Sequence, residues 1–95
     1  MKLQLYFCYI VICADGTFYT GWTTDPERRV KEHNYRKNGA VYTRLRRPVS
    51  LAYLESCVNR REAMKRELAI KKLTRKKKAA LITTYKLRQE NDSRE

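Results

Sequence analysis

The sequence predicts an α/β fold of the α+β type: a small, mainly antiparallel three-stranded sheet with three helices, in the order β-β-α-β-α-α. The first observation is size, because 95 residues form one domain with a modest core. The second is a pair of apolar, β-branched and aromatic runs around an Asp-Gly turn, which is typical of a hairpin. The third is a series of helix caps separated by a further apolar run. We place this single domain at residues 1–87 and a frayed polar tail at 88–95.

The first hairpin uses residues 5–13 and 17–23 as strands, joined by a turn at 14–16. The N-terminal run also resembles a short signal peptide, with one lysine ahead of apolar residues. Its removal would delete the strand with which the next apolar segment must pair, so we interpret it as a strand. Apolar side chains occur at both alternating sets of positions, which predicts that both faces of the sheet are covered.

The length of the hairpin loop decides which side chains meet. A two-residue turn would put Tyr9 and Tyr19 on opposite faces. A three-residue loop, with Gly16 in the left-handed conformation as a bulge, pairs Tyr9 with Gly21 and Val11 with Tyr19. Both phenols then share one face as diagonal neighbours, with backbones roughly 7–8 Å apart. We expect the three-residue loop, in which Gly21 leaves room for another group to approach the Tyr9 hydroxyl.

Capping signals predict the remaining elements. Asp25 is a good N-cap and is followed by proline, so a helix begins there and ends near residue 36 or 37, before Asn38-Gly39. Asn59 and Thr74 can cap two further helices, which we expect to run to about residues 72 and 85. Between these helices lie a basic loop at 39–48 and a third strand at 49–55.

The charge composition indicates a polyanionic partner. The chain has 22 Lys and Arg against 10 Asp and Glu, a net charge of +12. Nucleic acid is expected ahead of an anionic membrane surface, because no long amphipathic helix with bulky apolar residues is evident and no run approaches the roughly 18 apolar residues of a membrane span. Cys8, Cys13 and Cys57 form no C-x-x-C pair and His33 is the only histidine, which excludes a zinc finger and favours a reduced, cytoplasmic location.

Two tyrosine motifs and a helix start carry a resemblance to a known family. They are Phe7-Cys8-Tyr9, Tyr19-Thr20-Gly21, the run Gly21-Trp22-Thr23-Thr24-Asp25-Pro26-Glu27-Arg28-Arg29 and the pair His33-Asn34. Together they resemble the GIY-YIG nuclease superfamily from about residue 7 to 82, most of all its short stand-alone bacterial members. The first motif departs from the Gly-Ile-Tyr consensus. The resemblance favours the three-residue loop and implies a bare nuclease domain that hydrolyses DNA phosphodiesters, in repair or recombination.

The resemblance implies catalytic roles for four residues of the hairpin and first helix. Tyr9 would be the general base on the attacking water, and Tyr19 would position or relay that water. Arg29 would stabilise the pentacovalent phosphate, which suits a planar and permanently charged fork, and His33 would orient the tyrosine or the phosphate. Plainer interpretations exist: aromatic packing for the tyrosines, a surface ion pair for Arg29 and an exposed helix position for His33.

Glu67 stands in the middle of an apolar stripe on the expected second helix, between Ala63 and Ile70 on one side and Met64 on the other. A carboxylate there needs a partner, either an arginine or lysine at the edge of the core or a divalent metal. The family carries a metal-binding glutamate on this helix, so the resemblance implies that Glu67 holds one Mg²⁺ (or Mn²⁺). Mg²⁺ keeps several waters and accepts such a site, where it would stabilise the leaving 3′ oxygen and yield a 5′ phosphate.

Basic residues beyond the reaction site form the expected nucleic-acid-binding surface. Such side chains contact phosphate without reading sequence, and no recognition helix or second domain is visible, so sequence specificity should be weak. The plainer interpretation of the lysine run is a solvated face. Tyr42 and Arg44 are included because Tyr42-Thr43-Arg44 resembles the Tyr-Thr-Arg segment of the short bacterial members. The set is Arg28, Arg36, Lys37, Tyr42, Arg44, Arg46, Arg47, Arg75, Lys76, Lys77 and Lys78.

The resulting hypothesis is a metal-dependent DNA endonuclease that acts as a monomer on the structure or phosphate backbone of DNA. Two alternatives remain open: a nucleic-acid-binding module of the same fold with little or no catalysis, and a small basic RNA-associated protein. Binding without cleavage would follow if Glu67 were held in a salt bridge. RNA binding would predict exposed aromatic side chains on a sheet face, whereas both faces look covered. The sequence does not identify a targeting partner.

Overall fold

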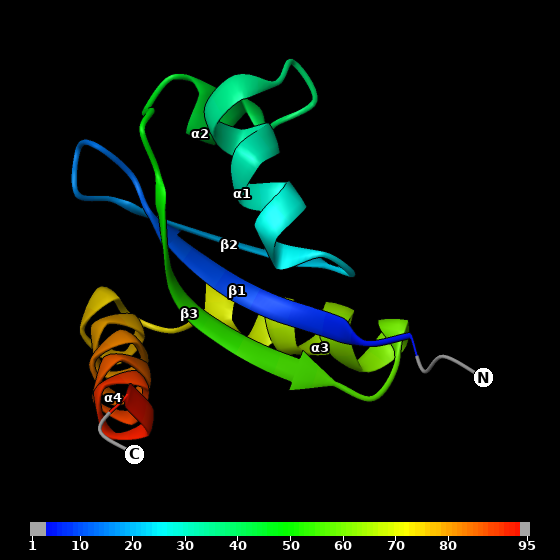
Figure 1. Cartoon of the computed structure of the whole chain (residues 1–95), viewed down its shortest axis with the longest axis vertical. Helices are drawn as coiled ribbons and strands as arrows, with labels where there is room; N and C mark the ends of the chain where they lie inside the picture. Colours follow the sequence, from blue (N-terminus) through cyan, green and yellow to red (C-terminus); the bar gives the residue numbers. More distant parts are fainter. Residues whose placement is uncertain (1–3, 94–95) are drawn as a thin grey trace.

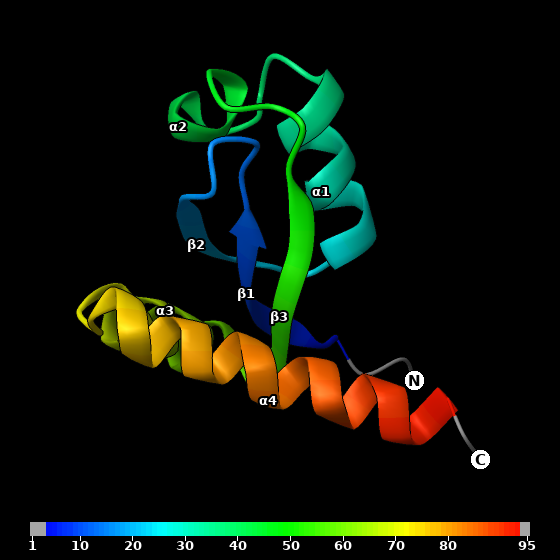
Figure 2. The same cartoon turned by 90° about the vertical axis from the view of Figure 1, so that its left-hand side faces the viewer.

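A computed structural model describes residues 4–93 as a three-stranded antiparallel sheet with helices on both sides (Figures 1 and 2). The strands are β1 (Tyr6–Ile12), β2 (Phe18–Thr23) and β3 (Ser50–Cys57), and β1 is central in the order β2-β1-β3. The helices are α1 (Pro26–Tyr35), α2 (Val41–Arg44), α3 (Arg60–Lys71) and α4 (Arg75–Ser93). The predicted α+β fold and element order are confirmed, with the single turn α2 as an addition.

The hairpin has the register that the three-residue loop predicts. Tyr9 pairs with Gly21 and Val11 pairs with Tyr19, so both tyrosines lie on the same face of the sheet. Gly16 has a φ angle of 83°, in the left-handed region that glycine adopts without a Cβ clash. The turn chemistry of this one glycine therefore decides which side chains of the two strands can cooperate.

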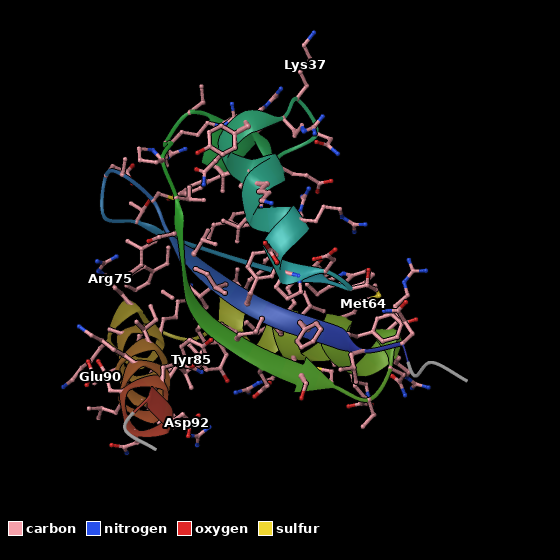
Figure 3. All side chains as sticks on the ribbon, in the orientation of Figure 1. Lys37, Met64, Arg75, Tyr85, Glu90 and Asp92 are labelled. Atoms are coloured by element: carbon pink, nitrogen blue, oxygen red, sulfur yellow. The ribbon has the colours of Figure 1, made fainter. Side chains whose placement is uncertain are left out.

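Helices cover both faces of the sheet, as the apolar pattern predicts. α1 packs on one face, where Val30 joins the buried cluster around Tyr9 and Val11. α3 and α4 pack on the other face (Figure 1), where Ile70 of α3 is fully buried. Tyr85 of α4, labelled in Figure 3, meets the ring of a β3 tyrosine edge-on at 5.9 Å between centroids. Alternate residues of the central strand β1 therefore serve two different helical layers.

The caps form where the sequence predicts them. Asp25 accepts a hydrogen bond from the Arg28 amide at 3.1 Å, and Asn59 accepts one from the Glu62 amide at 2.8 Å. Each bond satisfies an amide that has no partner within its own helix. α1 ends at Tyr35, close to the expected boundary. Its rigid start fixes the direction in which the next two turns project.

Two segments are more helical than expected. The expected basic loop at 39–48 contains the one-turn helix α2, and α4 continues past the expected end near residue 85 to Ser93. Neither glycine nor proline occurs in α4, and polar residues alone do not end a helix. Residues 88–93 therefore belong to α4, and the predicted fraying of the tail stays a prediction. Residues 94–95 lie outside the described residues, and the domain boundary at 87 stays a prediction.

The three cysteines carry free thiols. Cys8 and Cys13 are buried in the core, and burial raises the pKa of the Cys8 thiol to about 12, so it behaves as a small apolar residue. Among the described residues, no helix combines the length and the apolar character that crossing a bilayer requires.

Candidate active site

A cleft of about 470 Å³ opens where the hairpin, α1 and α3 meet. Four of the five predicted catalytic residues line it: Tyr9 and Tyr19 from the hairpin, Arg29 from α1 and Glu67 from α3. The structure thus gathers residues from the hairpin and the helix that follows it together with one from α3, more than 30 residues further along the chain. The remaining lining residues are Trp22, Thr23, Thr24, Arg28 and Glu32.

The fifth predicted residue, His33, does not line the cleft but lies beneath it. Its Nε2 atom is 2.7 Å from the Tyr9 hydroxyl oxygen, and its Nδ1 atom is 2.8 Å from the Thr43 hydroxyl oxygen of α2. His33 and Thr43 are fully buried, and Tyr9 is 1% exposed. The interpretation of His33 as an exposed helix residue is therefore wrong. The histidine is in position to act on Tyr9 and not directly on a phosphate.

Burial sets the protonation of the Tyr9–His33 pair. Burial raises the pKa of Tyr9 above the usual value for a phenol, while a hydrogen bond from the Arg29 guanidinium acts in the opposite direction. Burial also lowers the pKa of His33 to about 4, and the positive charge of Arg29 adds to this effect. At neutral pH both groups are uncharged, so the phenol keeps a proton to give and the imidazole keeps a lone pair to receive one.

Gly21 makes room for the Tyr9 side chain itself. A Cβ atom at position 21 would lie 2.5 Å from the Tyr9 hydroxyl oxygen and 2.8 Å from the adjoining ring carbon. The space opposite Tyr9 is therefore filled by the phenol, and the expectation that it stays open for another group is wrong. The close approach explains why a side chain at this position would displace the tyrosine.

Arg29 is fixed at the wall of the cleft. Its Nη1 atom donates to Glu32 Oε1 and to the Asn38 carbonyl oxygen, both at 3.0 Å. The bond from Arg29 holds the pKa of the Glu32 carboxyl below its usual range. The ion pair of the plainer interpretation is therefore present, yet 25% of the Arg29 side chain remains exposed. A guanidinium held in this way presents a preorganised positive charge to an anion in the cleft.

The Tyr19 ring contacts both His33 and α2. It meets the imidazole edge-on at 5.3 Å and stacks on Tyr42 at 6.1 Å, measured between ring centroids. Tyr42 in turn carries the Arg46 guanidinium 3.7 Å above its ring, and Arg46 pairs with Asp15 of the hairpin loop at 3.1 Å. The aromatic-packing interpretation therefore describes the Tyr19 ring correctly, and the same packing fixes Tyr19 in the wall of the cleft.

Glu67 enters the cleft from α3, with 19% of its side chain exposed. It pairs with Lys71 one turn later, where the Lys71 Nζ atom lies 3.5 Å from Glu67 Oε1 and the lysine is 46% exposed. Pairs of this spacing contribute only about 0.3–0.5 kcal/mol, which is too little to hold the carboxylate against a divalent cation. The alternative in which Glu67 is held in a salt bridge is therefore supported by a contact with Lys71, but this contact is weak.

A metal at this place would have few protein ligands. Within residues 4–93, no group of three or more His, Cys, Asp and Glu side chains lies close enough to hold an ion. Glu67 is a partly exposed hard-oxygen donor with one weak partner, which fits Mg²⁺ with water and substrate phosphate completing its shell. The donor set does not fit a preformed cage of protein ligands.

Four of the arginines predicted to bind nucleic acid use guanidinium donors on backbone carbonyl groups. Arg47 donates to the backbone carbonyls of Glu32, His33 and Arg36 at the C-terminal end of α1, where the Glu32 carbonyl also accepts the Arg36 amide. These four arginines therefore stabilise the fold through bonds to the backbone. The other three bonds are Arg44 to Lys37, Arg46 to Tyr42 and Arg75 to Gly16.

Other predicted cations are free to meet a ligand. Among the described residues, no ion pair involves Arg36, Lys37 or the lysines at 76–78. These cations fall into two separate places: Lys37 lies beyond the end of α1, and Arg75 marks the start of α4, well away from it (Figure 3). The predicted binding set is therefore two surfaces.

A hollow of about 620 Å³ follows the outer side of α1 and shares Arg28 and Glu32 with the catalytic cleft. It carries four cations against one carboxylate, because Arg28, Lys31, Arg36 and Lys37 line it together with Glu32. Tyr35 and Asn38 complete its lining. We call this feature the α1 groove.

Thr43, Lys31 and Tyr35 were not among the predicted site residues. Thr43 lies inside the segment from which Tyr42 and Arg44 were chosen, and a small hydroxyl there gave no sign of its buried partner. Lys31 and Tyr35 follow Arg28 by three and seven residues, the spacing that places side chains on one side of a helix. That spacing was the available signal for the α1 groove.

Comparison with known proteins decides the family. The family model described as the GIY-YIG catalytic domain matches residues 5–80. This chain belongs to the GIY-YIG family. The predicted family is confirmed, and with it a nuclease fold. Nucleases of the family generally depend on a divalent metal, and the domain implies DNA binding.

Similar GIY-YIG chains are short as well. A UPF0213 protein of Desulfotalea psychrophila is 57% identical over 77 residues, covering 81% of this chain and 70% of that one. A UPF0213 protein of Clostridium perfringens is 48% identical over 89 residues, covering 94% and 95%. The solution NMR structure of the E. faecalis protein EF2693 is 45% identical, with a TM-score of 0.59 over 88% of each chain.

Proposed function

We propose that the protein is a metal-dependent DNA endonuclease with weak sequence specificity, acting as a monomer in the cytoplasm. The observation that supports it best is the Tyr9–His33 hydrogen bond at the back of a cleft whose walls present Arg29 and Glu67. A proton relay, a fixed positive charge and a free carboxylate oxygen are the groups that phosphodiester hydrolysis needs. The nuclease fold supports a setting in DNA repair or recombination.

Tyr9 and His33 move the proton of the attacking water in this proposal. A water bonded to the Tyr9 oxygen gives a proton to the phenol while the phenol gives its own proton to His33 Nε2. The hydroxide formed attacks phosphorus, and the imidazolium releases its proton afterwards. Because both transfers occur together, the raised pKa of Tyr9 is no obstacle: phenolate never accumulates.

Arg29 binds the phosphate and also controls the strength of the base. Its charge contributes to the low pKa of His33 in the free protein. A phosphodiester in contact with the guanidinium offsets that charge, so the basicity of His33 rises when substrate is present. The same contact strengthens as negative charge develops in the transition state, where a preorganised donor has its largest effect.

Glu67 is the residue that would hold the divalent ion. When bound, that ion supplies stabilisation of the negative charge on the leaving 3′ oxygen, and the product carries a 5′ phosphate. Tyr19 positions the attacking water, because its side chain forms the wall of the cleft beside His33. The α1 groove supplies phosphate contacts on one side of the cleft, which explains binding without sequence readout.

A cleavage assay on duplex, nicked, branched and single-stranded DNA, with Mg²⁺ or with a chelator, tests the proposal. Glu67→Ala and Glu67→Gln should each slow cleavage by about 100-fold or more while DNA affinity stays near the parental value, because the lost ion contributes several kcal/mol to the barrier. Glu62→Ala is the matched control, since Glu62 lies on the same helix with half its side chain exposed. A folded Glu67→Ala protein that cuts at the parental rate would refute the metal role.

A binding module without catalysis is the second candidate, and the Glu67–Lys71 ion pair is the observation that favours it. Lys71→Ala separates the two functions. An endonuclease should cut within about twofold of its parental rate without Lys71, because such a pair contributes little. A parent without cleavage whose Lys71→Ala variant cuts would show that the lysine blocks the carboxylate.

A further inference from the structure

We propose that Thr43 fixes the tautomer of His33 and is thereby a positioning residue for the proton relay from Tyr9. The inference rests on the proposed endonuclease function for its catalytic consequence. The tautomer itself follows from the hydrogen bonds of α2 and α1, independently of any activity.

The Thr43 hydroxyl has one proton, and the structure shows where it goes. Thr43 Oγ1 lies 2.9 Å from the Ala40 carbonyl oxygen, which can only accept. The hydroxyl therefore donates to Ala40 and has only lone pairs left for His33. Because His33 Nδ1 lies 2.8 Å from the same oxygen, Nδ1 must carry the hydrogen and donate it to Thr43.

The second ring nitrogen of His33 follows from the first. A neutral imidazole has one N–H group, so a hydrogen on Nδ1 leaves Nε2 with its lone pair. Nε2 faces the Tyr9 hydroxyl at 2.7 Å, and the phenol must donate to it.

The other tautomer would disable the relay. With hydrogen on Nε2, the imidazole would point a donor at Tyr9, and the phenol would have no acceptor for the proton that it must pass on. Thr43 would also have to leave Ala40 to donate to Nδ1. His33 and Thr43 are fully buried, so water has little access to replace a lost partner of the imidazole.

The one-turn helix α2 positions two residues of the site. Its neighbour Tyr42 stacks on Tyr19, while Thr43 bonds the histidine. The turn is itself held by Arg44, whose amide donates to the Ala40 carbonyl at 3.0 Å. α2 therefore positions one residue of the cleft wall and one residue beneath the cleft.

The tautomer can be measured directly in the parent protein. His33 is the only histidine of the chain, so long-range ¹H–¹⁵N correlation spectra of tag-free, ¹⁵N-labelled protein report this ring alone. At pH 7 we expect a protonated Nδ1 and an unprotonated Nε2. A protonated Nε2 in the parent would overturn the proposal, whatever the nuclease activity is.

Two substitutions then test the role of the hydroxyl. Thr43→Val keeps the shape but removes the acceptor, so the Nδ1–H signal should lose its dominance and kcat should fall about 10²-fold or more, as expected for a disabled acid–base group, with DNA Kd within about twofold. Thr43→Ser restores the hydroxyl and should keep both the tautomer and the rate. Thr20→Val, the same change at a buried threonine of β2, controls for the loss of a buried hydroxyl.

The possible outcomes separate this proposal from the endonuclease proposal. A folded Thr43→Val protein with the parental tautomer and rate would overturn the role of Thr43. A Thr43→Ser protein that behaves like Thr43→Val would overturn it too. If Thr43→Val does not fold, the parental tautomer and the Thr43→Ser rate decide the matter. If the parent cuts no DNA, the endonuclease proposal fails, while a protonated Nδ1 in the parent and its loss in Thr43→Val still support the tautomer role.

Discussion

The two faces of β1 differ in what they bury. One face, against α3 and α4, buries Cys8 and Ile10 together with Ile70 in an apolar cluster. The other face, against α1, buries Tyr9 and carries the hydroxyl and imidazole groups of the candidate relay. A single strand therefore supplies stability on one side and chemistry on the other, because successive side chains of a strand point in opposite directions.

The contrast teaches how a small domain tolerates buried polar groups. Among the described residues, no buried side-chain nitrogen or oxygen lacks a hydrogen-bond partner. Complete pairing removes the cost that an unsatisfied buried group would carry. The apolar face needs only shape, whereas the polar face needs every partner. Substitutions on the two faces should therefore fail in different ways.

The largest effect on stability should come from the apolar face. Ile70→Ala removes a fully buried side chain and should lower the free energy of unfolding by about 2–5 kcal/mol. Urea titration measures this loss. Leu68→Ala is the matched control, because Leu68 lies on the same helix with 57% exposure and should cost far less. At temperatures where the Ile70→Ala protein is folded, its kcat should equal the parental value, and a loss of kcat there would contradict the division between the faces.

The opposite result is expected for Arg29→Ala on the polar face. Removing this charge from the cleft wall should lower kcat about 10²–10³-fold, as for the loss of one preorganised transition-state donor. Steady-state and single-turnover rates measure the effect, and circular dichroism checks the fold. Arg28→Ala, at the adjacent position with 59% side-chain exposure, should reduce kcat much less. Equal losses for the two arginines would remove Arg29 from the chemistry.

The pH dependence of stability should reveal the buried imidazole. The pKa of His33 is about 4 in the folded protein and about 6.5 in an unfolded chain, so the unfolded state binds the proton first. This contribution is fully present above pH 6.5 and falls by about 3 kcal/mol as pH drops to 4. Urea titrations at pH 7 and pH 4 of the parent and of His33→Gln measure it by difference. If the two proteins lose stability equally, His33 is not buried as a neutral group.

Salt dependence of affinity should distinguish the two basic surfaces, and it is the smallest effect. Log affinity falls as log salt rises, and each phosphate contact contributes about 0.9 to the steepness of that fall. The triple substitution of Lys31, Arg36 and Lys37 to Gln in the α1 groove should therefore make the line flatter by up to about 2.7. The matched triple substitution of Lys76, Lys77 and Lys78 should flatten it less, because only the α1 groove shares residues with the cleft. The reverse order would place the DNA path over the start of α4.

Local sequence predicted the hairpin and the helix starts well. The register follows from Gly16, whose left-handed conformation fixes a three-residue loop, and α1 starts where Asp25 and Pro26 indicate. These features depend on residues that are neighbours in the chain. The face shared by Tyr9 and Tyr19 and the side of α1 that carries Arg29 follow directly from them.

The fate of polar side chains could not be predicted in the same way. Arg47 looked like a phosphate ligand, but its guanidinium donates to three backbone carbonyls at the C-terminal end of α1. Helix spacing alone left His33 exposed in the plainer interpretation, but α1 presses that position against Tyr9. In both cases the partner comes from a separate element, and no spacing within the helix or loop reveals it.

The sequence by itself determined all the elements but α2, the register of the hairpin, the family and the four catalytic candidates that line the cleft, Tyr9, Tyr19, Arg29 and Glu67. Caps, turns and strand alternation act over a few residues, so their outcome can be read from local chemistry. Only the tertiary structure decided that His33 lies beneath the cleft, that Gly21 yields its space to Tyr9 and that Thr43 of α2 completes the hydrogen-bond chain. These arrangements depend on how α1 and α2 pack against the sheet, and buried hydrogen bonds form only where that packing brings a donor and an acceptor together without water.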